Sequence, residues 1–197
     1  MKNKGVLYAL CAGISWGISL GIFGRTMTSF GFTAMQVSAV RTTISAITFI
    51  ILALVTDRKA FRLNPKDIWI FLCSGFISVT LFCWCYFTST RLCSLAVGGV
   101  LQYTAPVWVV VFSAVIFKEP ITKVKAAAMA IAIAGCVLVS GITHGVGQVS
   151  VFGLVAGVFS GITYGSYTIF TRFAVPKYRT MTINVYTFIV ASATSLL

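Results

Sequence analysis

One arginine of this sequence lies far inside a long apolar stretch. Arg41 is the only charged residue of positions 34–56, and it stands about seven residues, or roughly 10 Å of helix, from the start of that stretch. A guanidinium this deep in a membrane costs at least about 2.5 kcal/mol, so it should face protein or water. There it would offer a fixed positive charge to an anion such as a carboxylate. Extension of the side chain back to the membrane surface is the alternative, and the sequence leaves both open.

Aromatic and amide side chains occur at comparable depth in the neighbouring apolar stretches. The five concerned are Trp16, Tyr86, Gln102, Tyr103 and Tyr164. Trp16 and Tyr164 lie too far from the ends of their stretches to act as interfacial anchors. Deep aromatic residues usually pack in a core, and that remains the alternative for them. Together with Arg41, these five residues are the predicted substrate-binding residues.

Acidic residues are scarce and lie only between the apolar stretches or at the edge of one. The chain has three, Asp57, Asp67 and Glu119. A proton relay built on membrane carboxylates is therefore not expected in this sequence. The apolar stretches also lack a base that could activate a nucleophile, and they lack the clustered ligands of a metal site. The sequence therefore predicts that the protein is not an enzyme and binds no metal or cofactor.

The elements that carry these residues are apolar stretches of membrane-spanning length. Hydrophobic residues make up 58% of the chain and charged residues 9%, against about a quarter charged in soluble domains. A membrane-spanning helix needs about 20 apolar residues, roughly twice the length of a barrel strand. Seven stretches qualify: 5–24, 34–56, 67–90, 94–117, 121–141, 150–171 and 181–197. The predicted fold class is an all-α membrane protein, a polytopic bundle of transmembrane helices.

Two of these stretches are near copies of each other, 148 residues apart. In the first copy every fourth residue is a glycine, except that Ala9 takes one place; these glycines are Gly5, Gly13, Gly17 and Gly21. The second copy repeats the spacing with Gly153, Gly157, Gly161 and Gly165. Such glycines let helices approach closely, so Gly13, Gly17, Gly161 and Gly165 are predicted packing positions, and direct contact of their backbone with substrate is the alternative. The two copies are the first and sixth stretches, so they cross the membrane in opposite directions. Inverted repeats of this kind are typical of secondary transporters.

Basic residues fall almost entirely on one side of the predicted helices. The chain has a net charge of +12, as many nucleic-acid-binding proteins do. Twelve of its fifteen Lys and Arg residues, however, precede the first stretch or follow the second, fourth and sixth: Lys2, Lys4, Arg58, Lys59, Arg62, Lys66, Lys118, Lys123, Lys125, Arg172, Lys177 and Arg179. This asymmetry predicts a cytoplasmic N-terminus and a lipid partner, not a nucleic acid.

The fourth stretch and its exit carry the most recognisable motifs. Pro106 removes a hydrogen bond there, which predicts a bend that either shapes a cavity, acts as a hinge or is passive. Residues 101–108 (LQYTAPVW), 117–120 (FKEP) and 134–138 (AGCVL) resemble the EamA domain of the drug/metabolite transporter superfamily. Arg41 and Tyr86 also match positions where that family tends to carry an arginine and an aromatic residue.

The resemblance implies a ten-helix carrier made of two inverted five-helix repeats around a central cavity. Residues 1–145 correspond to the first repeat and 149–197 to the start of the second, with seven helices present. The last stretch is still apolar at its final residue, so we expect a truncated chain that does not transport without helices 8–10. Carried over from the family, Glu119 is the acidic residue after the fourth helix, and we expect it to organise that turn beside Lys118, Lys123 and Lys125.

The predicted function is secondary transport of a small-molecule substrate by alternating access. Amino acids, related metabolites and drugs are the substrates that the resemblance implies, often exported across an inner or plasma membrane. A seven-helix receptor or sensor is the alternative, and a cytoplasmic N-terminus disfavours it. The sequence sets no oligomeric state.

Overall fold

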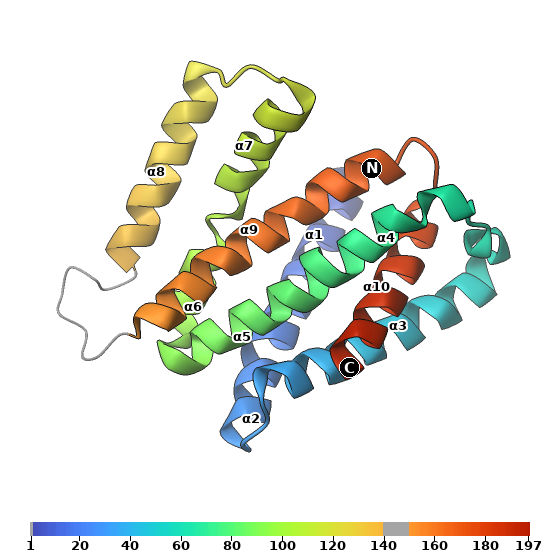
Figure 1. The fold of residues 1–197 in the computed structure, drawn as a ribbon, viewed down its shortest axis with the longest axis horizontal. Helices are drawn as coiled ribbons and strands as arrows, with labels where there is room; N and C mark the ends of the chain where they lie inside the picture. Colours follow the sequence, from blue (N-terminus) through green and yellow to red (C-terminus); the bar gives the residue numbers. More distant parts are fainter. Residues whose placement is uncertain (1, 140–149) are drawn as a thin grey trace.

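The structure is a computed structural model, and it describes residues 2–139 and 150–197. These residues form helices joined by short connections, and none of them lies in a β-strand. The α-helices, labelled in Figure 1, are α1 (Lys2–Trp16), α2 (Gly24–Ser29), α3 (Ala34–Thr56), α4 (Ile68–Gly75), α5 (Phe82–Leu92), α6 (Leu95–Gln102), α7 (Ala105–Phe117), α8 (Lys123–Val139), α9 (Val151–Ala174) and α10 (Thr180–Leu196).

Two π-helical segments join neighbouring α-helices into longer runs. Gly17–Phe23 connects α1 to α2, and Phe76–Leu81 connects α4 to α5. With these joins, and with α6 and α7 counted as one run over Leu95–Phe117, the described helices form seven successive runs, as the sequence predicts. The end of the predicted fifth stretch, at 140–141, and the predicted repeat boundary at 145–149 lie outside the described residues.

Four helical runs are long and apolar enough to cross a membrane. They are Gly5–Ser29, Ala34–Thr56, Pro65–Leu92 and Leu95–Phe117. In the sixth run, α9, Gly, Ser and Thr residues occupy much of the length, and the glycines, Ser160 and Thr163 are buried against other helices. The predicted all-α membrane fold is confirmed.

The glycine pattern of α9 lies against the third and fourth runs. A Cβ atom added at Gly161 would collide with Thr104 Oγ1 and lie 3.1 Å from the carbonyl oxygen of Leu101. One added at Gly165 would lie 3.1 Å from the carbonyl oxygen of Ala105. Glycine therefore allows α9 to approach α6 and α7 backbone to backbone, as expected where lipid removes the hydrophobic drive for helix association.

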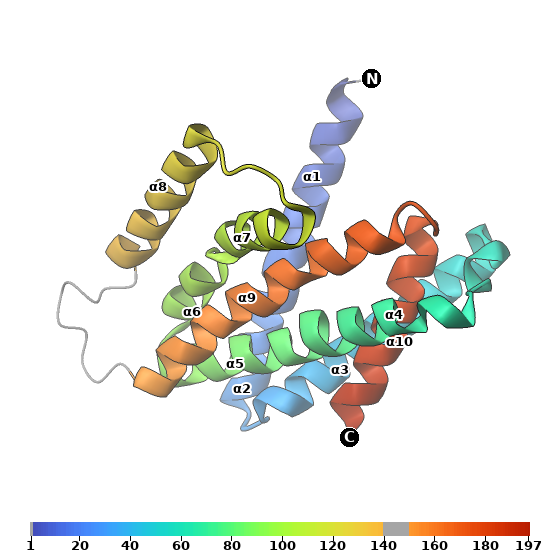
Figure 2. The same ribbon diagram turned by 45° about the horizontal axis from the view of Figure 1, so that its top comes forward.

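The matching glycines of α1 and the segment that follows it are not packed. A Cβ atom added at Gly13 or Gly17 would meet no atom of another element within 4 Å among the described residues. The prediction that both glycine patterns pack closely is therefore wrong for the first copy in this structure. The side chains of Val6, Leu10 and Ile14 on the same helix are about 60% exposed. Figures 1 and 2 show α1 and α9 running in opposite directions, and Figure 2 shows α1 projecting from the other helices.

The fourth run is broken instead of bent. Helix α6 ends at Gln102, and α7 begins at Ala105 after a turn at Tyr103 and Thr104. Pro106 thus occupies the first turn of α7, where its missing N–H would have no helical partner in any case. The predicted kink within one continuous helix is corrected to a break between two helices, and the break turns Gln102 and Tyr103 toward cavities described below.

Hydroxyl pairs connect α10 to α3 and to the run from α4 to α5. The pairs are Ser38 with Ser195, Thr43 with Ser192, Ser74 with Thr187, and Thr80 with Thr194, with oxygens 2.8–3.3 Å apart. Paired hydroxyls stabilise helix contacts in a membrane, where no water competes for them. The seventh run is therefore fixed to the second and third.

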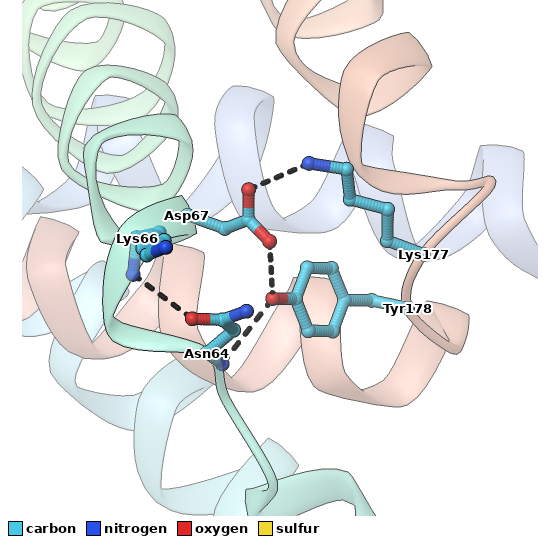
Figure 3. Close-up of polar contacts among 5 residues, drawn as sticks. All are labelled: Asn64, Lys66, Asp67, Lys177 and Tyr178. Carbon is cyan, nitrogen blue, oxygen red and sulfur yellow. Dashed lines mark hydrogen bonds and ion pairs between the residues drawn. The ribbon is translucent and has the colours of Figure 1, made fainter.

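All three acidic residues of the chain pair with basic residues in the last turn of α9 or in the connection between α9 and α10. Asp57 accepts a hydrogen bond from Arg179 at 2.8 Å, and Glu119 pairs with Arg172. Figure 3 shows the third pair, in which Lys177 Nζ donates to Asp67 at 2.6 Å while the Tyr178 hydroxyl donates to the same carboxylate at 2.7 Å. We call the end of the molecule that carries these three pairs the ion-paired end.

The contacts of Glu119 extend beyond the turn in which it was predicted to act. Its carboxylate lies 3.9 Å from Lys125, one of the three lysines expected beside it, but it also pairs with Arg172 at the end of α9. The Arg172 guanidinium in turn lies over the ring of Phe117 at 4.1 Å. Glu119 therefore joins the turn after α7 to the sixth run.

Candidate functional site

Arg41 points into the protein, not toward the membrane surface. Helix α3 begins with a capping box in which Thr33 and Gln36 each bind the other's backbone N–H, so Arg41 lies two turns inside the helix. Its Nε donates to Ser19 Oγ at 2.9 Å, and Nη1 donates to Cys83 Sγ at 3.0 Å. Its guanidinium carbon lies 5.7 Å from the centre of the Trp16 ring.

The partners of this guanidinium are neutral. The three carboxylates of the chain are all bound at the ion-paired end, so none of them neutralises Arg41. A hydroxyl and a thiol fix the direction of the side chain but leave its positive charge uncompensated. In a region of low dielectric, such a charge attracts an anion strongly.

A cavity of about 270 Å³ lies beside Arg41. Its lining residues come from both predicted repeats: Trp16, Arg41, Phe49, Ser78, Val79, Phe82, Tyr164, Tyr167, Asn184 and Phe188. Aromatic walls with a few polar groups are typical of small-molecule sites. We call this space the Arg41 cavity.

Both π-helical segments contribute to this region. Ser19 belongs to the segment that follows α1, and Ser78 belongs to the segment between α4 and α5. A π-helical turn shifts the side chains that follow it relative to a regular helix, and such turns are frequent at functional sites.

Two further cavities share Trp16 with the Arg41 cavity. One cavity of about 420 Å³ and another of about 140 Å³ share Trp16, Gln102 and Tyr103 as lining residues. Tyr164 lines the larger of these two, and Tyr86 lines the smaller. The structure thus brings all six predicted substrate-binding residues to three cavities that have Trp16 in common.

Polar atoms within these cavities are free to bind a ligand. Gln102 is only 7% exposed, yet its side-chain amide makes no hydrogen bond with the described residues. The Tyr86 hydroxyl is likewise without a partner in the described part of the chain, although the side chain is 4% exposed. Gln102 and Tyr86 both line the cavity of about 140 Å³, so a bound ligand or water there can pair with their polar atoms.

The sequence analysis did not identify several residues that bind Arg41 or line the Arg41 cavity. Ser19 and Cys83 bind the guanidinium, and Asn184 and Tyr167 bind each other at 3.3 Å in the cavity wall. Asn184 is an amide within an otherwise apolar stretch, which is a signal that could have identified it. Ser19 and Cys83 have no such signal because small polar residues are common throughout membrane helices.

The arrangement suits reversible binding. Its groups are one guanidinium, hydroxyls, amides and aromatic rings, which recognise a small anion or zwitterion with apolar parts. Within residues 2–139 and 150–197, no three His, Cys, Asp or Glu residues converge on a common point that a metal ion could occupy.

Comparison with known proteins identifies one family. The model of the EamA-like transporter family matches residues 3–141, which is well over half of the chain. No curated protein sequence and no solved structure matches the chain significantly. The matched part contains Trp16, Arg41, Tyr86 and Gln102, whereas Tyr164 lies beyond it.

Proposed function

The chain belongs to the EamA-like transporter family, and hence to the drug/metabolite transporter superfamily, and we propose that it is a secondary carrier of small carboxylate-bearing metabolites. Amino acids and related compounds are the substrate class we favour. The carrier works by alternating access, in a cell membrane, with its N-terminus in the cytoplasm. The excess of Lys and Arg at one end of the helices supports that orientation.

The observation that carries this proposal is the uncompensated charge of Arg41 at the wall of an aromatic cavity. Arg41 is held by Ser19 and Cys83, which are neutral, so a substrate carboxylate would supply the missing negative charge. Trp16 and Tyr164 line the same cavity and suit the apolar part of a metabolite. Gln102 lies one cavity away and can bind an amide or amino group as the substrate passes.

Alternating access requires that one end of the molecule opens while the other closes. The pair of Glu119 with the last turn of α9, and the pairs of Asp57 and Asp67 with the connection between α9 and α10, hold the ion-paired end together. Their side chains are partly exposed, and surface ion pairs contribute little to stability. We propose that this end opens during the cycle by breaking these pairs, which the modest strength of each pair allows.

Transport itself is the decisive test. The full-length protein in sealed vesicles preloaded with unlabelled amino acids should accumulate labelled substrate by counterflow from a panel of amino acids and short carboxylic acids. Vesicles carrying the double variant Arg41→Gln, Trp16→Ala serve as the control for leakage. Absence of counterflow for every compound of the panel, with correctly inserted protein, would overturn the proposal.

A further inference from the structure

A fourth cavity, of about 600 Å³, lies far from the ion-paired end. It is lined by residues of α2, of the end of α5 and of the start of α6, together with one residue of the first π-helical segment: Leu20, Arg25, Thr28, Thr90, Ser94, Leu95 and Ala96. Figures 1 and 2 show α2 well away from the connection between α9 and α10. The predicted substrate-binding residues do not line this cavity.

Arg25 gives the cavity a positive charge. The side chain is exposed, and it makes no ion pair or hydrogen bond with the described residues. Since the three carboxylates of the chain are bound elsewhere, they do not neutralise this guanidinium either. Its donors are therefore available to an anion that enters the cavity.

Ser94 adds a hydroxyl that can donate. Its Oγ accepts the N–H of Val97 at 3.1 Å as the N-cap of α6, and its own proton goes to no described atom. Thr28 and Thr90 differ, because their hydroxyls already donate to the carbonyls of Gly24 and Phe87. The donors that face the cavity are thus the Arg25 guanidinium and the Ser94 hydroxyl, which together match a carboxylate.

The cavity adjoins the one that contains Tyr86 and Gln102. Leu20 and Leu95 line both spaces, and Leu20 is almost completely buried between them. That second space shares Trp16 with the Arg41 cavity. Arg25 and Arg41, both uncompensated, therefore stand at the two ends of one row of cavities. Leu20 and Leu95 separate the cavity of Arg25 from the next cavity in this row.

We propose that the cavity of Arg25 and Ser94 is a vestibule that captures the carboxylate of a substrate before it passes Leu20 and Leu95 toward Arg41. This inference rests on the proposed transport function and adds a second binding position to it. A positive charge at the mouth of a cleft raises the local concentration of anions, and the effect weakens as salt screens it.

Thiol reactivity at Ala96 tests the vestibule without a transport assay. Ala96 is exposed and lines the cavity, so Ala96→Cys places a reactive thiol there at little structural cost. The background carries Cys11→Ala, Cys73→Ala and Cys93→Ala, which removes the exposed and half-exposed thiols. The rate of modification is measured with an anionic sulfonate reagent and with a cationic trimethylammonium reagent of equal size, in phosphatidylcholine vesicles.

The ratio of the two rates reports the local charge. We expect the anionic reagent to react faster, and Arg25→Gln to lower the anionic-to-cationic ratio about tenfold, since one charge a few ångströms away acts oppositely on the two reagents. Arg91→Gln is the matched control, because Arg91 is exposed at the end of α5 but does not line the cavity. Since salt screens a charge that lies outside the cavity, Arg91→Gln should change the ratio less than about twofold. Equal effects of the two substitutions would overturn the proposal.

Protection by small molecules separates a soluble substrate from a lipid. Propionate should slow the modification of the Ala96→Cys variant in phosphatidylcholine vesicles, whereas its neutral isostere propionamide should not, and Arg25→Gln should abolish the protection. Protection that occurs only after phosphatidylglycerol is added would assign the cavity to a lipid headgroup and overturn the vestibule. If propionate protects but the full-length protein transports nothing, the carboxylate site stands and the proposed transport function fails.

Discussion

Trp16 and Tyr164 pack edge to face, with ring centres 5.6 Å apart and planes at 61°. They occupy corresponding places in the two glycine-rich helices, 148 residues apart in the chain. The Arg41 guanidinium lies 5.7 Å from the same Trp16 ring, and both aromatic residues line the Arg41 cavity. The contact between the two sequence repeats is therefore also a wall of the candidate site.

The hydroxyl of Tyr164 should contribute to substrate affinity. It makes no hydrogen bond with the described residues, while the ring packs on Trp16 and on Phe82 at 5.1 Å. Tyr164→Phe keeps these ring contacts and removes only the hydroxyl. We expect a rise in KM of about fivefold, the equivalent of one net hydrogen bond of about 1 kcal/mol, with an unchanged melting temperature. An unchanged KM in vesicle uptake would mean that Tyr164 serves packing alone.

The two glycine patterns should respond differently to the same substitution. Gly161→Ala places a methyl group against Thr104 and the Leu101 carbonyl, and overpacking of this kind costs about 1–3 kcal/mol. Gly13→Ala, at the corresponding place in α1, meets open space in the structure and should cost nothing. Unfolding of the purified protein in detergent measures both. Equal destabilisation would show that α1 is as closely packed as α9.

The pair of Lys177 and Asp67 should be sensitive to alkaline pH. The hydrogen bond from Lys177 to the Asp67 carboxylate raises the pKa of Lys177 above its ordinary value of 10.5. A group whose pKa is raised on folding stabilises the protein fully below its unfolded pKa, and this contribution is lost as the pH rises through the folded pKa. The loss therefore begins above pH 10.5.

Lys177→Arg isolates this contribution from the other groups that titrate in alkali. Arginine stays charged at that pH, so the variant should lose less stability than the original protein above pH 10.5 and match it near neutral pH. The measurement is the melting temperature as a function of pH for the two proteins. Parallel curves throughout the alkaline range would contradict a role for the pair.

The pair of Asp57 and Arg179 should instead lose its stabilising effect at acidic pH. The hydrogen bond from the Arg179 guanidinium lowers the pKa of Asp57 below its ordinary value of 3.8. The stabilising contribution of this pair is present above that value and is lost only as the pH falls below it. The pairs Asp57–Arg179 and Asp67–Lys177, two of the three at the ion-paired end, are therefore intact across the physiological range.

The sequence predicts the helices well because hydrophobic runs and charges act locally. Residues 34–56 form α3 with the same bounds, and 150–171 correspond closely to Val151–Ala174. The membrane requires each run to satisfy its backbone hydrogen bonds internally, so a long apolar stretch has few structures other than a helix. The pattern of apolar stretches also predicts how deep Arg41 lies in its helix and that the two glycine-rich helices run in opposite directions.

The contacts between helices could not be predicted in the same way. Gly13 and Gly161 have the same sequence surroundings, yet only Gly161 meets a neighbour, because α9 lies against α6 and α7 whereas the described residues place no helix against Gly13. The break before Ala105 depends on how two helices pack, and Pro106 alone predicts only a bend. Ser19, Cys83 and Asn184 join the site through tertiary packing, which no local pattern encodes.

The charge of Arg41 is the central claim, and paired substrates test it most directly. Uptake of a labelled amino acid and of its neutral amide is measured for the full-length protein and for Arg41→Gln, with Arg91→Gln as a matched loss of one positive charge outside the cavity. The account predicts that Arg41→Gln lowers uptake of the carboxylate at least tenfold more than uptake of the amide, while Arg91→Gln leaves the ratio unchanged. Equal loss of both substrates on replacement of Arg41 would contradict it, because the arginine would then only support the fold.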